Sequence, residues 1–281
     1  MAGIGRIGFV VNPYNDRAQE VLERARSWCA AHGVATWDHT AEAADAIAAD
    51  CPGTDLICVL GGDGTFLRTA HAIGDSGVPA LGVNLGRIGF LAKVETAELE
   101  HALDQVAAGE YGVEDRFRIG ATIVRTQGAR ETFACLNEVV MARGERVRMI
   151  QVAVDVSGSH LATYLADGVV VATATGSTAY SFSAGGSILD PRLRNMIITP
   201  VASYLSPLHS VVAGEEQVVT LTLQGGHDGA VVSVDGQTDL VLEPGDQVEV
   251  HALDEPLRLI EPAGSASFYD LLRTKAALLP Y

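Results

Sequence analysis

Residues 56–66 read LICVLGGDGTF. The apolar run at its start predicts a buried strand, and the helix-patterned residues after Phe66 predict a helix directly behind the glycines. Glycines at such a junction let backbone N–H groups close on a phosphate without interference from Cβ atoms, and the helix N-terminus adds its positive dipole end. An ordinary tight turn with a helix cap is the alternative. We favour a phosphate site.

Asp63 is the single carboxylate in this glycine loop. Phosphates repel a carboxylate unless it holds a metal ion or takes a proton from a nucleophile. The loop therefore predicts phosphoryl transfer, with Asp63 in the reaction.

The composition is typical of an enzyme of ordinary size. A chain of 281 residues with 48% hydrophobic residues is long enough for two domains. We expect a cytoplasmic protein without a membrane partner, because the N-terminus lacks a signal pattern and no apolar stretch approaches the ~20 residues of a membrane span. The four cysteines show no CxxC spacing, so neither disulfides nor a zinc site is expected.

The net charge of −16 argues against a nucleic-acid partner. Neither Lys93 nor Lys275 follows a GxxxxG loop, so a Walker-type phosphate site is not expected. Backbone amides, arginines and a divalent metal must then neutralise an anionic substrate. The GxGxxG spacing of Gly3, Gly5 and Gly8 precedes the first strand instead of following it, which argues against a dinucleotide fingerprint there.

The first part of the chain alternates between strand and helix patterns. We expect strands at 7–11, 56–60 and 80–83, a helix at 17–32, and one helix between each pair of strands. This order predicts a parallel sheet covered on both faces, with ligands at the carboxyl ends of its strands.

A second glycine-rich loop, NLGRIGF at 84–90, follows the strand at 80–83. Two such loops would form two walls of one crevice, with Arg87 as a phosphate partner and Phe90 as a stacking surface for a base. Close packing with Phe90 in the core remains the alternative.

The pattern changes after about Tyr111. Short β-branched runs predict strands at 119–125, 138–141, 149–156, 169–173, 196–199, 218–223, 230–234, 239–242 and 247–251. Turn signals lie at 225–229 and 235–237, and residues 267–278 are compatible with a helix. We therefore expect an α/β domain of residues 1–115 with a tail, 258–281, that returns to it, and a β-rich domain of residues 116–257.

Two polar constellations lie in the β-rich part. Asn137 and Glu138 are placed inside an apparent strand, where they must be exposed in a bulge or bound to hydroxyls and ring nitrogens. The segment 167–186 joins Asp167, a strand, the turn TGST and a helix start, which is a pattern for binding an anion and a ribose. A capped helix with small packing residues is the alternative.

Four motifs in this order resemble the NAD kinase family over most of the chain. They are GGDGTF at 61–66, GVNLGRIGFL at 82–91, Asn137-Glu138 and DGVVVATATGSTAYSFSAGG at 167–186. The first motif is shared with diacylglycerol kinases, sphingosine kinases and phosphofructokinases, whereas the later motifs are specific to the NAD kinase family. The resemblance implies an α/β domain joined to a β-rich NAD-binding and oligomerisation domain, ATP-dependent phosphorylation of the adenosine ribose 2′-hydroxyl of NAD, Mg²⁺ or another divalent metal, and a homo-oligomer, a dimer or tetramer.

The resemblance also implies roles for individual residues. Asp63 resembles the general base, and Asp167 the residue that reaches the nicotinamide end. The other expected contacts with ATP and NAD are Gly61, Gly62, Gly64, Thr65, Arg68, Phe90, Asn137, Glu138, Thr178, Ala179, Tyr180 and Ser183. No residue is assigned as a metal ligand.

The chain departs from the family pattern at three places: Ala174, Leu165 and the segment 211–214. Leu165 bears on whether NADH is also accepted, so the choice between NAD and NADH is open at this stage. The choice between ATP and polyphosphate is open because a loop of backbone amides could bind either phosphate chain. Two other functions also fit the glycine loop: a related kinase acting on a lipid or sugar hydroxyl, and a non-catalytic NAD(P)-binding regulator.

Overall fold

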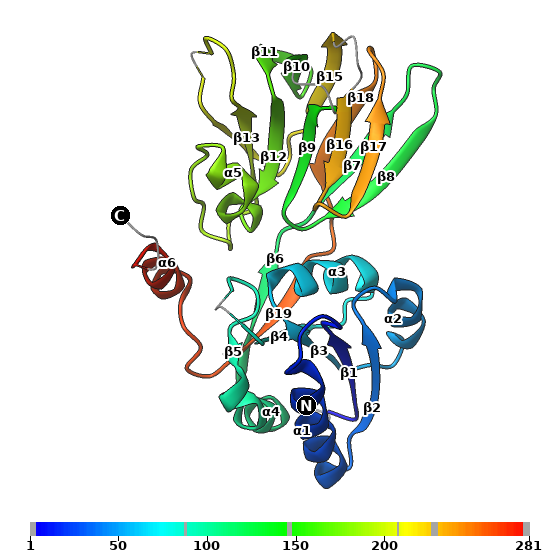
Figure 1. The fold of residues 1–281 in the computed structure, drawn as a ribbon, viewed down its shortest axis with the longest axis vertical. Helices are drawn as coiled ribbons and strands as arrows, with labels where there is room; N and C mark the ends of the chain where they lie inside the picture. Colours follow the sequence, from blue (N-terminus) through cyan, green and yellow to red (C-terminus); the bar gives the residue numbers. More distant parts are fainter. Residues whose placement is uncertain (1–3, 87–88, 145–147, 207, 226–229, 278–281) are drawn as a thin grey trace. The chain divides into compact units, whose positions relative to one another are not determined.

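The computed structural model describes residues 4–86, 89–144, 148–206, 208–225 and 230–277. The chain divides into two compact units, one of Met1–Asp115 with Leu257–Tyr281 and one of Arg116–Pro256 (Figure 1). The first has a parallel sheet with helices, and the second is built from β-strands. The predicted fold class is confirmed.

The first unit contains a sheet in the order β2-β1-β3-β4-β19-β6, with β5 beside β4. The strands are β1 (Arg6–Val11), β2 (Ala35–Thr40), β3 (Leu56–Gly61), β4 (Ala80–Asn84), β5 (Val94–Glu95), β6 (Tyr111–Arg116) and β19 (Leu257–Pro262). β1 pairs in parallel with β2 and β3, and β4 pairs in parallel with β3, β5 and β19. Every residue of β3 is buried, as expected for a central strand of a parallel sheet.

Helices cover both faces of this sheet (Figure 1). They are α1 (Ala18–His32), α2 (Ala44–Asp50), α3 (Asp63–Ile73) and α4 (Leu99–Ala108), which follows the short 3₁₀ helix η1 (Thr96–Glu98). α1 packs beside α4, and α2 packs beside α3. Gly33 ends α1 with a φ of 68°, a left-handed conformation that favours glycine.

One strand–helix pair of this sheet, β2 and α2, was not predicted. The sequence pattern predicts a single helix between the first two strands, which is wrong because α1, β2 and α2 all lie there. β2 is an edge strand, and only one of its six residues is fully buried. An edge strand needs few apolar side chains, so it leaves little hydrophobic pattern in the sequence.

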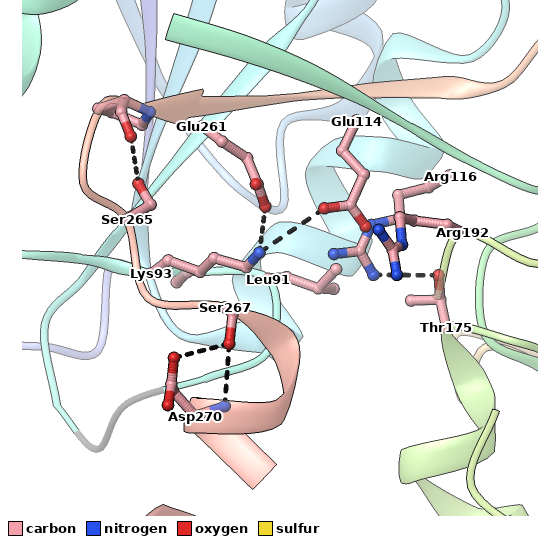
Figure 2. Close-up of polar contacts among 12 residues, drawn as sticks. Leu91, Lys93, Glu114, Arg116, Thr175, Arg192, Glu261, Ser265, Ser267 and Asp270 are labelled. Carbon is pink, nitrogen blue, oxygen red and sulfur yellow. Dashed lines mark hydrogen bonds and ion pairs between the residues drawn. The ribbon is translucent and has the colours of Figure 1, made fainter. Parts of the chain in front are cut away.

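The C-terminal segment adds α6 (Phe268–Ala277) to the first unit. Ser267 caps this helix, because its Oγ accepts a hydrogen bond from Asp270 N at 3.2 Å and donates one to Asp270 Oδ2 at 2.6 Å (Figure 2). The Phe268 ring lies 5.7 Å from the ring of Phe90. The tail thus returns to the first unit, as predicted.

The second unit consists of two six-stranded sheets, β11-β10-β15-β18-β7-β8 and β14-β13-β12-β9-β16-β17. The strands are β7 (Ile119–Val124), β8 (Arg130–Cys135), β9 (Glu138–Arg143), β10 (Ile150–Val156), β11 (Ser159–Ala166), β12 (Gly168–Thr173), β13 (Asn195–Val201), β14 (Val211–Gly214), β15 (Val219–Gly225), β16 (Ala230–Val234), β17 (Thr238–Leu242) and β18 (Gln247–Ala252). Two short helices, η2 (Gly176–Thr178) and α5 (Tyr180–Ser183), follow β12.

All nine predicted strands of this unit are present. Alternate residues of both sheets form one buried core, which includes Ile123, Val152, Val171 and Val232. The turn predicted at 235–237 is present, whereas residues 226–229 of the other predicted turn lie outside the described residues. Within the described part of the chain, no helix combines the length and apolar character that crossing a membrane requires.

Candidate functional site

The connections of the parallel sheet indicate a candidate ligand position in the first unit. From β1 the chain crosses to β2 on one side and then to β3 on the other. Ligands of open parallel sheets bind outside the carboxyl ends of the strands at such a reversal. The reversal lies between Val11, which ends β1, and Gly61, which ends β3. A cavity of ≈ 280 Å³ lies beside it and is lined in part by Asn12, Asn15 and His39.

Packing inside the protein requires only some of the glycines in the GGDGT loop. A Cβ atom on Gly61 would lie 2.4 Å from Thr65 Oγ1, so packing inside the protein requires this glycine. A Cβ on Gly62 or Gly64 would meet nothing within 4 Å, and neither residue has a left-handed φ. A glycine inside a helix costs about 1 kcal/mol relative to alanine, and Gly64 lies in the first turn of α3. The fold thus leaves open space in front of these two backbone positions.

Asp63 begins α3, and its carboxylate accepts hydrogen bonds from three successive backbone amides. Oδ2 accepts from Phe90 N at 2.9 Å, and Oδ1 accepts from Leu91 N at 3.0 Å and Ala92 N at 3.2 Å. A carboxylate has about four lone-pair positions, so one acceptor position remains. The side chain is held in one orientation beside the amides that open α3, which have no acceptor within the helix. The end of the second glycine loop therefore lies against Asp63 of the first.

The far side of the second loop is fixed by Lys93. Its side chain is 8% exposed, and its Nζ forms ion pairs with Glu261 of β19 and, at 3.8 Å, with Glu114 of β6 (Figure 2). Gly89 lies against Asp63, because a Cβ there would be 2.0 Å from Asp63 Oδ1. The segment from Gly89 to Lys93 is thus held at both ends.

Three further predicted residues lie on this unit. Phe90 is half-buried and is covered by α6, with Lys275 Nζ 4.5 Å from its ring centroid. Arg68 is exposed on α3, and Thr65 is buried in the same helix. Arg87 lies outside the described residues.

In the second unit, the structure corrects the expected setting of Asn137 and Glu138. They do not lie inside one strand: β8 ends at Cys135 and β9 begins at Glu138, and these two strands belong to different sheets. The chain crosses between the sheets here. The strand pattern misled because both flanks of the pair are apolar, whereas the break itself depends on contacts from distant segments.

The crossing packs directly on the TGST turn. Thr173 N donates to Asn137 O at 2.8 Å, and Thr173 Oγ1 donates to Leu136 O at 2.6 Å. A Cβ on Gly176 would lie 2.1 Å from Asn137 O, so only glycine permits this approach. The structure therefore brings together two motifs that are about forty residues apart in the sequence.

Two side-chain oxygens at the crossing are buried. Asn137 Oδ1 and Glu138 Oε2 have no hydrogen-bond partner among the described residues. Leaving such an atom unsatisfied costs about 1–3 kcal/mol. Burial, and then the nearby charge of Asp235, raise the pKa of Glu138 to about 8. Both atoms are suited to bind the hydroxyl and amino groups of a ligand.

The raised pKa of Glu138 makes a prediction for stability. An unfolded-chain glutamate has a pKa of about 4.3, so between that value and about 8 the folded protein holds a proton that the unfolded chain has lost. Folding stability must then fall as the pH rises through this window. Glu138→Gln removes the titration, so in the absence of ligand its melting temperature should exceed that of the wild type most at about pH 8.5 and least at about pH 5. Thermal unfolding of both proteins between about pH 5 and about pH 8.5 checks this prediction. A difference in melting temperature that does not change with pH would contradict it.

The remaining predicted residues lie at the two ends of β12, Asp167 before it and the others after it. Thr178 and Ala179 are half-buried, while Tyr180 and Ser183 are exposed on α5. Asp167 precedes β12, and its Oδ1 accepts a hydrogen bond from Arg143 Nε at 2.9 Å.

Two residues of this region are not indicated by the sequence motifs. Asp235, in the turn after β16, accepts hydrogen bonds from the amides of the crossing. Arg116 is 2% exposed and donates to Thr175 Oγ1 at 3.4 Å (Figure 2). Of the two, only Asp235 lies in a recognisable sequence pattern, the Asp-Gly turn at 235–236. That pattern predicts a hairpin turn and does not indicate what the Asp235 side chain binds.

The described residues contain no group of three or more His, Cys, Asp or Glu side chains arranged to hold a metal ion. Mg²⁺ in phosphoryl-transfer sites is commonly held by substrate phosphates, waters and one or two carboxylates. At the glycine loop three backbone amides already bind the Asp63 carboxylate, so a Mg²⁺ ion there would be held chiefly by the phosphates of the nucleotide and by waters.

Two family models match the chain. Residues 5–111 match the ATP-NAD kinase N-terminal domain, and residues 136–262 match the ATP-NAD kinase C-terminal domain. The chain belongs to the NAD kinase family. It is 38% identical over 276 residues to the NAD kinase of Heliobacterium modesticaldum, which covers 96% of this chain and 97% of the relative. The NAD kinase of Magnetococcus marinus is 42% identical over 224 residues, covering 79% of this chain and 73% of the relative.

Two solved structures share the fold of this NAD kinase family member. Yeast NADH kinase complexed with NADH has a TM-score of 0.86 at 23% identity, and the match covers 99% of this chain and 88% of that one. An NAD kinase from Archaeoglobus fulgidus in complex with ATP has a TM-score of 0.78 at 24% identity, covering 98% of this chain and all of the other, 100%.

Proposed function

We propose that this protein transfers the terminal phosphoryl group of ATP to the 2′-hydroxyl of the adenosine ribose of NAD, which gives NADP. The observation that carries the proposal is Asp63, held by three amides at the start of α3 beside two glycines that the fold does not require. This combination provides space for phosphates, amide donors and one oriented base. Membership of the NAD kinase family supports NAD as the acceptor and ATP as the donor.

In the proposed reaction Asp63 takes the proton of the ribose 2′-hydroxyl. The hydroxyl oxygen then forms a bond to the terminal phosphorus of ATP, and the bond between that phosphorus and the bridging oxygen of ADP breaks. The three amide bonds leave one acceptor position of Asp63 for the hydroxyl and hold the carboxylate still, so little reorganisation is needed during transfer. Mg²⁺ or another divalent ion, bound to the nucleotide, supplies neutralisation of the phosphate charge.

The roles of the other residues follow from their places. Gly62, Gly64 and the amides that open α3 bind phosphates, and Arg68 supplies a positive charge from the same helix. Asn137 and Glu138 bind the adenosine of NAD through their buried oxygens. Thr178, Ala179, Tyr180 and Ser183 form the wall at the end of β12, Asp167 binds toward the nicotinamide, and Phe90 stacks on a base.

This assignment gives each domain a role. The domain of residues 1–115 with 258–281 binds ATP, and the domain of residues 116–257 binds NAD and forms a homo-oligomer, a dimer or tetramer. Exposed apolar side chains on the second unit support an oligomer, because Tyr204 is 61% and Leu205 82% exposed, and Tyr204 N bonds to the backbone of the exposed Leu165. A cytoplasmic location is supported by four cysteines that are buried and free.

Gly64→Ala separates folding from phosphate binding. Alanine should raise the melting temperature slightly, because it favours the helix by about 1 kcal/mol and its methyl group enters open space. The same methyl group occupies the place of a phosphate oxygen, so KM for ATP should rise by about tenfold or more, a loss of about 1.4 kcal/mol. Thermal unfolding and steady-state kinetics measure the two effects. A variant with higher stability and unchanged KM would contradict the phosphate site.

The test of the proposed function is an assay with purified protein, Mg²⁺, ATP and NAD, in which NADP is detected directly. Parallel reactions replace ATP by polyphosphate, NAD by NADH, and NAD by a diacylglycerol or a sugar. NADP formed from ATP and NAD supports the proposal. Transfer only to a lipid or sugar, or NAD binding without transfer, would overturn it.

A further inference from the structure

Asp235 lies in the tight turn between β16 and β17. Asp235 and Gly236 have φ values of 50° and 64°, and Gln237 N donates to Val234 O at 2.9 Å. Two successive left-handed residues closed by this bond form a type I′ hairpin turn. The turn directs the Asp235 side chain back onto the crossing between β8 and β9.

The carboxylate of Asp235 binds the whole crossing. Oδ2 accepts from Leu136 N at 2.7 Å, and Oδ1 accepts from Asn137 N at 2.8 Å, from Glu138 N at 3.0 Å and from Cys135 Sγ at 3.0 Å. The backbone N of Asp235 in turn donates to Glu138 O at 3.0 Å. Successive N–H groups that converge on one anion form a nest, and here the anion is part of the protein.

This contact decides how the crossing presents its side chains. A segment that leaves one sheet for the other loses strand pairing, so its amides need other acceptors. Asp235 supplies them for three residues in a row and thereby fixes the backbone from which Asn137 Oδ1 and Glu138 Oε2 extend. Those two buried oxygens have no partner among the described residues.

We propose that Asp235 is a positioning residue for nucleotide binding: it holds Asn137 and Glu138 so that their free oxygens meet the ribose hydroxyls and purine amino group of NAD. This inference rests on the proposed function. Asp235 does not touch the reacting atoms; it acts through the two residues whose amides it binds.

The negative charge of Asp235 also affects Glu138 electrostatically. Among the described residues, the titratable groups that face Glu138 are Asp235 and Cys135, and Asp235 contributes to the raised Glu138 pKa of about 8. If Asp235 acts through Glu138, the pH dependence of NAD binding must contain an inflection near this value. Removing the Asp235 charge must move that inflection to lower pH.

The experiment compares KM for NAD, kcat and their pH profiles in the wild type and in Asp235→Asn, Asp235→Glu and Asp246→Asn. Asp246 is the matched control, since its carboxylate also accepts two backbone amides of the second unit, from Thr126 at 2.9 Å and Glu243 at 3.0 Å. Asp235→Asn should raise KM for NAD by about tenfold with a smaller change in kcat, and should shift the inflection below pH 8. Asp235→Glu keeps the charge but displaces the amides, so KM should rise while the inflection stays.

Asp246→Asn should leave KM for NAD within about twofold of the wild type, even if its melting temperature falls as much as that of Asp235→Asn. Equal KM increases in Asp246→Asn and Asp235→Asn, or an unchanged KM and inflection in Asp235→Asn, would overturn the inference. If the Asp235 variants do not fold, Glu138→Gln decides: the inflection near pH 8 must disappear, and its persistence overturns the inference. A wild type that forms no NADP would instead overturn the proposed function.

Discussion

Asp63→Asn should lower kcat by about 10²–10⁴-fold, the range that a general base contributes, while KM for NAD changes little. Asparagine cannot take the proton of the 2′-hydroxyl, and the residues assigned to NAD binding are untouched. Initial rates of NADP formation, together with NAD binding measured by calorimetry, check this expectation. A variant that keeps full turnover would remove Asp63 from the role of base.

Asp63 also has a structural role, and a control must separate the two. Asparagine would place an NH₂ group against the backbone N–H of one of the three bonded residues, at a cost of about 1–3 kcal/mol. Asp55 provides the comparison: it precedes the same strand, β3, and its Oδ2 accepts from Gly5 N at 2.8 Å and Arg6 N at 2.9 Å. Asp55→Ala should lower stability and leave kcat unchanged. A large loss of kcat in both variants would indicate that destabilisation alone explains the effect.

Gly89→Ala should have the second largest effect. The added Cβ would lie 2.0 Å from Asp63 Oδ1, which is far closer than any non-bonded contact allows. The carboxylate must leave its three amides or the loop must move, and either change misplaces the carboxylate that we propose as the base. We expect a loss of about 2–4 kcal/mol in stability, from several charge-assisted hydrogen bonds, and a fall in kcat of about 10²-fold or more.

Gly86→Ala is the matched control in the same loop. A Cβ on Gly86 meets nothing within 4 Å, and its backbone is held by Asn84 through bonds of 3.0 Å and 3.2 Å. Its melting temperature should therefore stay close to that of the wild type, and unfolding curves of the two variants measure the difference. If Gly89→Ala is as stable and as active as Gly86→Ala, the close approach of the loop to Asp63 is not needed.

Much of the fold could be predicted from local patterns. The buried face of α1 and the strands β1, β3 and β4 are strongly apolar, so periodicity locates them. β2 and α2 could not be located in this way. β2 has only one fully buried residue, and it forms because β1 offers an open edge, which is a property of the assembled sheet.

The candidate site shows the same division. The GGDGT loop was recognised from its residues, because a strand, glycines and a helix start are neighbours in the chain. The packing of Gly176 on Asn137 and the bonds from Asp235 to residues 136–138 were not predictable, since they join segments that are forty to a hundred residues apart. No local periodicity records such contacts.

The sequence alone determined the class of the fold and the family, and it supplied the site residues that we propose, because hydrophobic period and short motifs are local properties of the chain. Only the tertiary structure decided that Asp63 is held by Phe90, Leu91 and Ala92, and that Asp235 shapes the crossing at Asn137 and Glu138. The physical reason is common to both. An unpaired backbone amide must find an acceptor, and where the chain leaves regular pairing that acceptor comes from a residue that folding brings close.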